Sequence, residues 1–215
     1  MIGICIRGVD VKKFKDRALD IGLHYCKSVI NGKNVIGYHA PILNLEDEKN
    51  IDYLKNLIKN LDGDYLTIHI NRGEDEVKEE VIENLKILNS LCKKLKIKLC
   101  IENLRRGFSS NPKNILKVAD EVGCYITFDI GHVPYGKRLE FIDVIGDKIY
   151  NCHFYEIEKD GKHIAPKDLR NLREVIDKLL DVKCNLYLIE LMKEEEIKRT
   201  ERLLREYLLE VGKIC

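Results

Sequence analysis

Four residues of the kinds that bind divalent metal ions stand at the ends of short apolar runs. These residues are Glu102 in LCIENL, Asp129 in TFDIGH, His153 in NCHFYE and Glu190 in LYLIEL. Burying unpaired carboxylates at the mouth of an apolar core is costly, and a divalent cation offsets that cost by binding them as a cluster. Mixed histidine and carboxylate ligands suit Zn²⁺ or Mn²⁺, whereas oxygen-rich sets suit Mg²⁺ or Mn²⁺. Because chance placement at four run ends is rare, the four residues together predict a metal site.

A second set of histidines accompanies these residues. His39 ends the run in GYHAP, His69 lies in LTIHI, His132 follows three residues after Asp129, and His163 lies in a predicted loop. Taken alone, His39 and His69 fit a structural role as well as a metal-binding one. His132 is placed either to reach the same pocket or to cap the following helix. For His24, which precedes the second predicted strand, we favour a structural role.

Basic residues gather in the predicted loops that follow the strands. They are Arg7, Arg72, Arg105, Arg106, Lys137, Arg138 and Lys162. Such groups bind phosphate through charge-assisted hydrogen bonds. The candidates for substrate binding are Arg72, Arg105, Arg106 and Lys162. Acidic residues occupy the same set of loops, so ordinary solvated loop charge is the alternative; these are Glu46, Asp47, Glu48, Glu156 and Glu158.

The elements that would position these residues are short apolar runs that alternate with longer amphipathic segments. The predicted strands are Ile2–Ile6, Tyr25–Ile30, Val35–His39, Tyr65–Ile70, Ile97–Glu102, Tyr125–Asp129, Ile149–Phe154 and Leu186–Glu190. Most are continuously apolar, as expected of strands buried on both faces of a parallel sheet. The predicted helices begin near Asn50, Asp75, Pro112 and Lys167, and a last one contains Ile197 to Val211. Each carries an apolar stripe at helical spacing.

This alternation predicts an α/β fold, a (β/α)8 TIM barrel that occupies residues 1–215 as a single domain. The chain is short for this fold, which typically needs about 250 residues. The stretch Ser28–Val35 leaves no room for a helix, so we expect a compact barrel that lacks the helix between strands 2 and 3. A doubly wound open sheet is the alternative. In a TIM barrel the carboxyl ends of all strands meet at one face, where the candidate residues would converge.

Composition limits the classes of function. Lys and Arg number 37 and Asp and Glu 36, so the net charge of +1 gives no overall attraction to nucleic acid or anionic lipid. No apolar run approaches the roughly 18 residues of a membrane span, and the opening MIGICIRG lacks a secretory signal pattern, so we expect a cytoplasmic protein. The eight cysteines form no CxxC pair, which favours buried reduced thiols. Abundant Lys, Glu and Ile indicate a thermophilic source, although the cysteines argue the other way.

As an ordered set, the motifs around these residues resemble those of the xylose isomerase-like TIM barrels. This superfamily includes endonuclease IV and many sugar isomerases and epimerases. The motifs are HAPILNL (39–45), IHINRG (68–73), IENL (101–104), FDIGH (128–132), HFYE (153–156), DGKHIAP (160–166) and LIEL (188–191). For the isomerases and epimerases, the resemblance implies that Glu102, Asp129, His153 and Glu190 hold one catalytic metal. It also implies that Glu102 and Glu190 act as acid and base on opposite faces of the substrate.

The endonuclease IV pattern adds further metals. There the resemblance implies that His39 and His69 join Glu102 around a second zinc, and that His132 and His163 belong to a third. The third zinc of that pattern takes an Asp two residues before the second His, where this chain has Gly161. This departure counts against a trinuclear site. The short stretch between strands 2 and 3 also removes a region that helps the nuclease engage DNA.

Two functions are compatible with this pattern. The first is a divalent-metal-dependent isomerase or epimerase that holds one ion and acts on a sugar or sugar phosphate by proton transfer through a metal-stabilised enediolate. We favour it for the Gly161 departure, the short corner and the balanced charge. The alternative is an endonuclease IV-like zinc phosphodiesterase that holds two or three ions and acts at abasic sites in DNA. A barrel that has lost catalysis and binds a ligand or partner ranks last, and no membrane partner is expected.

Overall fold

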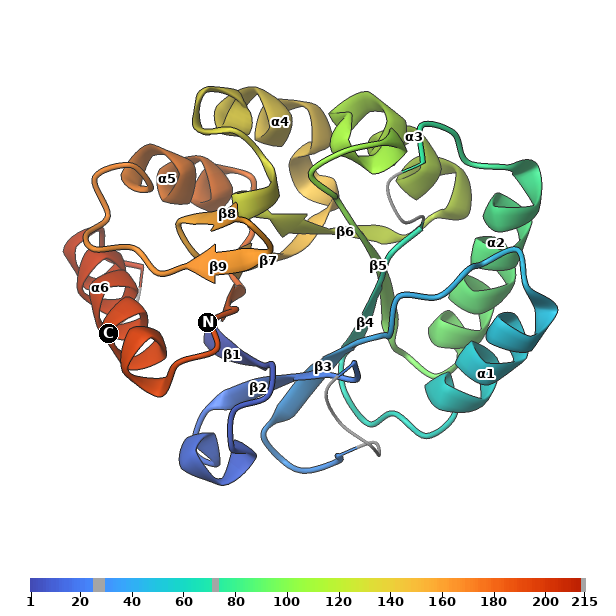
Figure 1. Ribbon diagram of the computed structural model, residues 1–215, viewed down its shortest axis with the longest axis horizontal. Coiled ribbons are helices and arrows are strands. Elements are labelled where there is room, and N and C mark those ends of the chain that lie inside the picture. Colours follow the sequence, from blue (N-terminus) through green and yellow to red (C-terminus); the bar gives the residue numbers. More distant parts are fainter. Residues whose placement is uncertain (25–29, 71–73, 214–215) are drawn as a thin grey trace.

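The computed structural model describes residues 1–24, 30–70 and 74–213 (Figure 1). Within these residues, eight parallel strands close into a barrel in the order β1-β10-β7-β6-β5-β4-β3-β2. The strands are β1 (Ile2–Ile6), β2 (Ala18–Gly22), β3 (Val35–His39), β4 (Tyr65–Ile68), β5 (Lys98–Glu102), β6 (Tyr125–Asp129), β7 (Ile149–Phe154) and β10 (Tyr187–Ile189). Because β1 pairs with both β2 and β10, the sheet closes on itself. The predicted (β/α)8 TIM barrel is confirmed, and the open sheet is excluded.

Helices surround the barrel (Figure 1). They are α1 (Glu48–Ile58), α2 (Glu79–Lys94), α3 (Pro112–Val122), α4 (Arg138–Ile145), α5 (Arg173–Asp181) and α6 (Glu194–Glu210). α3 has clear boundaries, since the Asn111 side chain accepts a hydrogen bond from Lys113 N at its start and Gly123 adopts φ 70° at its end. α4 is not among the predicted helices, because its eight residues are too few for a clear apolar period. Among the described residues, no helix is both long and apolar enough to cross a membrane.

The second barrel strand is β2, which corrects the strand predicted at Tyr25–Ile30. Residues 25–29 of that prediction lie outside the described residues. The apolar pattern misses β2 because Asp20 interrupts its run, ALDIG. Asp20 is fully buried, and it accepts hydrogen bonds from the Cys5 thiol at 3.2 Å and from the Tyr65 hydroxyl at 2.6 Å. These bonds offset the cost of burying a carboxylate inside the barrel.

The connections on either side of β2 contain no α-helix among the described residues. A single 3-10 turn, η1 (Val11–Phe14), lies between β1 and β2. Between Gly22 and Val35, the residues that the structure describes form no helix. Residues 25–29 of this connection lie outside the described residues, so the missing helix between strands 2 and 3 stays a prediction.

A small antiparallel hairpin follows β7 and is formed by β8 (Ile157–Lys159) and β9 (Lys162–Ile164). Asp160 and Gly161 make its turn, with φ values of 51° and 71°. Positive φ at both central positions is the signature of a type I′ turn, which favours Asp-Gly. His163, predicted to lie in a loop, therefore lies in a strand of this hairpin, and Gly161 is required by the turn.

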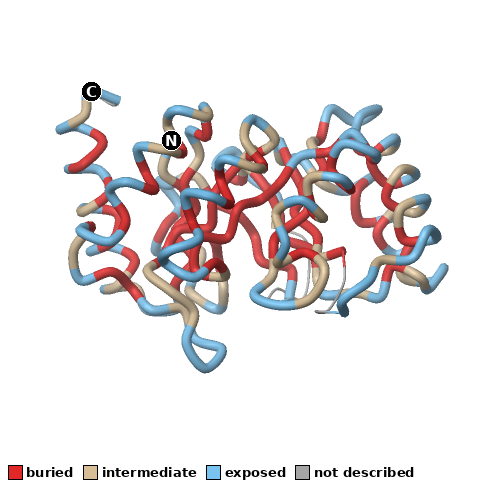
Figure 2. The backbone as a smooth tube through the Cα atoms, turned by 90° about the horizontal axis from the view of Figure 1, so that it is seen from above, coloured by how far each residue is buried: buried red, intermediate tan, exposed pale blue. Residues whose placement is uncertain are grey.

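Two apolar layers hold the barrel together. The larger one lies between the strands and the helices, and Figure 2 shows its buried backbone through the middle of the molecule with exposed residues around it. The smaller one lies inside the barrel and contains Tyr65, Cys100 and Leu188. The Tyr65 ring lies so close to Gly37 that a β-carbon there would meet it at 2.1 Å. Only glycine fits at that position of β3.

Candidate metal centre

A cavity of about 600 Å³ opens at the carboxyl ends of the barrel strands. Its walls include Cys5 from β1, His39 from β3, Glu102 from β5 and Asp129 from β6, and Glu190 directly after β10. Parallel strands present their carboxyl ends on one face, so residues far apart in the sequence meet there.

The structure brings together the four residues first singled out, Glu102, Asp129, His153 and Glu190, which we call site A. His153 Nδ1 lies 3.4 Å from Glu102 Oε1, 3.6 Å from Asp129 Oδ2 and 3.2 Å from Glu190 Oε2. All four residues are buried, with at most 2 % of their surface exposed. Three carboxylates therefore face one imidazole in a buried site.

The polar atoms of site A fit a divalent cation. Asp129 Oδ2, Glu190 Oε2 and both ring nitrogens of His153 are buried, and none makes a hydrogen bond to the described residues. Buried polar groups in proteins are almost always satisfied, so such a cluster needs an explanation. A cation of the Zn²⁺, Mn²⁺ or Mg²⁺ type would bind these atoms and neutralise the carboxylates.

A second group, site B, shares one residue with site A. His39 Nε2 lies 3.1 Å and His69 Nε2 2.9 Å from Glu102 Oε2, and the two nitrogens are 3.2 Å apart. Glu102 thus presents Oε1 to His153 and Oε2 to the other two histidines. A carboxylate placed in this way can bridge two cations.

Charge interactions within these groups are strong. Burial opposes protonation of His153, but Glu190 and Glu102 outweigh it and raise its pKa well above the usual value. Burial would likewise raise the pKa of Glu102, yet the neighbouring histidines, with His39 foremost, hold it well below the usual range. A proton on His153 and a cation in site A therefore compete for the same position.

The residues around Asp129 decide which of its oxygens faces the cavity. Oδ1 accepts hydrogen bonds from the Tyr155 hydroxyl at 2.7 Å and from the backbone N–H groups of Gly131 and His132 at 2.9 and 3.0 Å. Asn103 fixes the backbone, since its amide donates to Asp129 O at 3.0 Å and accepts from Asp129 N at 2.7 Å. With Oδ1 fully used, Oδ2 is left to bind a cation.

His132 is engaged on both ring nitrogens. Nδ1 lies 2.8 Å from Asn103 O and Nε2 lies 2.9 Å from Glu158 Oε2. Burial opposes its protonation, but Asp129 and Glu158 outweigh that and raise the pKa of His132 to about 10. His132 is therefore held as a doubly donating imidazolium.

His163 approaches the same region from the hairpin. Its ring stacks on Tyr155 at a centroid distance of 3.8 Å, and its Nδ1 lies 2.8 Å from the backbone oxygen of Glu190. Ligand atoms of Asp129, His132 and His163 still lie within 4.8 Å of one another. In this third group, however, both nitrogens of His132 already have partners: Nδ1, which lies 3.7 Å from Asp129 Oδ2, is bonded to Asn103 O, and Nε2 is bonded to Glu158.

The basic residues divide into three kinds. Arg105 and Arg106 line the cavity, and Arg105 forms an ion pair of 3.2 Å with Glu158. Lys162 is exposed on β9 and is not part of the cavity wall. Arg138 is buried and donates hydrogen bonds to the backbone oxygens of Val133 and Glu156, which is a structural role. Arg72 lies outside the described residues.

Several residues of the cavity region were not predicted to belong to it. Glu158 was counted only as loop charge, and Cys5 only as a buried thiol. The signal for Glu158 is the Asp-Gly turn that follows it, because a hairpin there directs alternate side chains to one face. His24, predicted to be structural, lines the cavity with its ring centroid 5.3 Å from that of His39. Burial, with His39 next, lowers the pKa of His24 to about 4.

Residues 7–208 match the family model described as xylose isomerase-like TIM barrel, and the chain belongs to that family. The chain is 54 % identical over 211 residues to a protein of Methanocaldococcus jannaschii named uncharacterized protein MJ0008, a match that covers 97 % of this chain and 96 % of that one.

Two solved structures have the same fold. A xylose isomerase domain protein from Planctomyces limnophilus superposes with a TM-score of 0.73 at 9 % identity, covering 99 % of this chain and 97 % of that one. The 3-keto-D-glucoside 4-epimerase YcjR of E. coli superposes with a TM-score of 0.71 at 10 % identity, covering 97 % and 98 %.

Proposed function

We propose that this protein is a divalent-metal-dependent isomerase or epimerase of a sugar or sugar phosphate. The observation that carries the proposal is site A, where Glu102 and Glu190 both line a cavity of about 600 Å³ and both approach His153. A cavity of this size suits a small molecule. The name of the E. coli epimerase with the same fold supports a sugar as the substrate class.

The roles of the residues follow from their positions. Site A would hold the cation with Glu102, Asp129, His153 and Glu190. When bound, the cation would act as a Lewis acid toward the oxygens of the substrate. Glu102 and Glu190 would move the carbon-bound proton, one as base and the other as acid.

Residues of the cavity wall would bind the substrate and exclude water from it. Arg105 and Arg106 stand at the cavity, where they would bind an anionic group of the substrate. Ile42 and Leu104 contribute apolar wall. Closing such a site against water strengthens every charge interaction inside it.

Exchange of substrate hydrogen with solvent tests this proposal. The protein is incubated in D2O with Zn²⁺, Mn²⁺ or Mg²⁺ and a panel of aldoses, ketoses and their phosphates, and deuterium on carbon is followed by NMR. We expect incorporation into one substrate class, reduced at least about 100-fold by Glu102→Gln and by Glu190→Gln. Glu174→Gln, on the exposed face of α5, is the control. Exchange that survives in both variants of site A would rule out this mechanism.

Site B favours a second candidate, a zinc phosphodiesterase that acts at abasic sites in DNA. Two cations bridged by Glu102 would supply the arrangement that two-metal phosphoesterases use. Incision of a duplex oligonucleotide with one abasic site, lost on His69→Ala, would support this candidate. A content of at most one metal ion per chain, in protein purified without added metal, would exclude it.

A further inference from the structure

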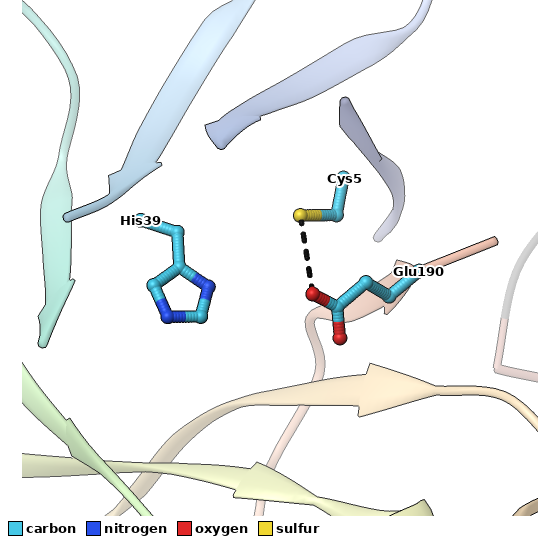
Figure 3. Close-up of side chains that lie close together, drawn as sticks. All are labelled: Cys5, His39 and Glu190. Carbon is cyan, nitrogen blue, oxygen red and sulfur yellow. Dashed lines mark hydrogen bonds between the residues drawn. The ribbon is translucent and has the colours of Figure 1, made fainter. Parts of the chain in front are cut away.

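Cys5 stands apart from the other cysteines. Of the cysteines that the structure describes, only Cys5 lines the cavity. It lies near the carboxyl end of β1 and is fully buried. Figure 3 shows its side chain pointing between His39 of β3 and Glu190, with the sulfur close to the carboxylate.

The distances are those of a potential ligand set. Ligand atoms of Cys5, His39 and Glu190 all lie within 4.8 Å of one another, and Cys5 Sγ is 3.8 Å from Glu190 Oε1. Zinc binds thiolate sulfur at about 2.3 Å and histidine nitrogen or carboxylate oxygen at roughly 2.0–2.2 Å. Ligand atoms around a tetrahedral zinc are therefore separated by roughly 3.5 Å. Small side-chain shifts would bring the three atoms to that separation.

A second observation concerns Glu190, the residue that this group shares with site A. Glu190 is 2 % exposed, and its Oε2 makes no hydrogen bond to any described residue. Arg7 forms an ion pair of 3.0 Å with the other oxygen, Oε1. The oxygen nearest to Cys5 is therefore the one held by the Arg7 guanidinium, whereas Oε2 faces His153 Nδ1 at 3.2 Å, so this buried carboxylate lies between Cys5 and site A.

The Cys5 thiol also has a carboxylate partner, Asp20, in addition to Glu190. The Cys5 thiol donates to Asp20 Oδ1 at 3.2 Å, and Asp20 is itself fixed by the hydroxyl of Tyr65. Outer carboxylates of this kind orient metal ligands and increase their basicity. When a cation binds, the S–H bond breaks, its proton passes to Asp20, and a sulfur–metal bond forms without any change of oxidation state.

We propose that Cys5 is a thiolate ligand of a cation held with His39 and Glu190 between β1, β3 and β10. The inference rests on the proposed metal-dependent function because it shares two residues with sites A and B. A thiolate is a soft ligand, so the centre discriminates in favour of Zn²⁺ and Co²⁺ and against Mg²⁺. The thiol then belongs to the metal centre, in contrast to the structural cysteines of the barrel and helices.

Absorption spectroscopy of the cobalt-loaded protein tests the proposal. Co²⁺ bound to any site of this type gives visible d–d bands, whereas a thiolate ligand adds a sulfur-to-cobalt charge-transfer band in the near ultraviolet. We expect both features in the natural protein, and loss of only the near-ultraviolet band in Cys5→Ser. Cys100→Ala, which removes a buried thiol inside the barrel, should keep both.

The outcomes distinguish the role of Cys5 as a ligand from the proposed metal-dependent function. Visible bands without a near-ultraviolet band in the natural protein would overturn the role of Cys5 and leave the metal-dependent function standing. Failure to bind Co²⁺ at all would overturn both. Cys26 lies outside the described residues, so Cys26→Ser is measured in parallel, and loss of the band there but not in Cys5→Ser would also overturn the proposal.

Metal affinity gives a second measurement that does not depend on spectra. In calorimetric titrations, Cys5→Ser should bind Zn²⁺ at least about tenfold more weakly than the natural protein, by comparison with the loss seen for outer-shell changes. Its affinity for Mg²⁺ should be unchanged. An equal loss of affinity for both ions would indicate general damage to the site and would contradict a thiolate ligand.

Discussion

The hydroxyl of Tyr155 donates a hydrogen bond of 2.7 Å to Oδ1 of Asp129, and the Tyr155 ring fills the space beside Gly131. The bond completes three donors on one oxygen of Asp129 and leaves the other oxygen for a cation. A β-carbon on Gly131 would stand 2.0 Å from the Tyr155 ring. The orientation of Asp129, a ligand in the proposed metal site, therefore depends on the absence of a side chain two residues later in the sequence.

Gly131→Ala should weaken cation binding and stability together. The added methyl group must displace the Tyr155 ring and break its bond to Asp129, because the contact is with packed ring atoms. Overpacking of this kind costs about 1–3 kcal/mol of unfolding free energy. Loss of a bond that orients a ligand costs roughly tenfold to 100-fold in metal affinity. Urea unfolding and calorimetric titration with Zn²⁺ measure the two effects.

Gly136→Ala is the matched control for this substitution. Gly136 belongs to the same connection after β6, and a β-carbon there would meet no atom within 4 Å. We expect a change within about 0.5 kcal/mol and unaltered Zn²⁺ affinity. If both variants behaved alike, the packing of Tyr155 would not matter to the metal site.

Glu102→Gln and His69→Ala should separate the two cation positions. Glu102 contributes one oxygen to each site, so Glu102→Gln should lower the affinity of both, by at least about 100-fold for site A. His69 touches only site B, so His69→Ala should leave the first ion bound and remove any second one. Metal analysis after dialysis gives the number of ions per chain. A full complement of metal in Glu102→Gln would contradict the bridging position of this carboxylate.

The barrel could be predicted from the sequence wherever a strand is continuously apolar. The runs of β3, β6 and β7 have the predicted bounds, because strands buried on both faces carry few polar residues. β2 breaks this rule with Asp20, whose burial depends on partners from two other strands. Such compensation is a tertiary effect and leaves no local signal.

The candidate site, too, could be predicted only in part. Residues at strand ends, such as Glu102 and Glu190, could be placed together in advance because the barrel fixes where its carboxyl ends meet. The position of Glu158 could not be placed in advance, since the Asp-Gly turn indicates a hairpin but not how that hairpin folds back toward His132 and Arg105. Likewise, nothing in the run IGICI distinguishes Cys5 from a structural thiol until its neighbours across the barrel are known.

Cys92 and Cys124 should resist alkylation at pH 9. Burial raises the pKa of each thiol from the ordinary 9.0 to about 12. At pH 9 a rise of three pKa units lowers the thiolate fraction from about one half to about 0.1 %, roughly 500-fold, and the thiolate is the reactive form. Because the folded pKa is raised, these thiols contribute stability that is present below about pH 9 and is lost as the pH rises through about 12.

Iodoacetamide followed by peptide mass analysis checks this expectation. The two cysteines should remain unmodified in the folded protein at pH 9. In the protein unfolded with about 8 M urea, both should react fully. Rapid modification of either residue in the folded protein would mean that the α2 and β6 regions open locally more often than their burial implies.

Removal of metal should lower the melting temperature. Three buried carboxylates crowd His153, and a cation that binds only the folded protein stabilises it by mass action. At 100 times its Kd, the stabilisation is about 2.7 kcal/mol. In a chain of this size, about 1 kcal/mol corresponds to roughly 2–4 °C, so EDTA should lower the melting temperature by about 5–10 °C. Glu102→Gln, with a damaged centre, should melt at the same temperature with and without EDTA. If EDTA left the melting temperature of the Zn²⁺-loaded natural protein unchanged, site A would be stable without a cation. The hydrogen bonds of Asp129 and a protonated His153 would then be sufficient to stabilise the carboxylates.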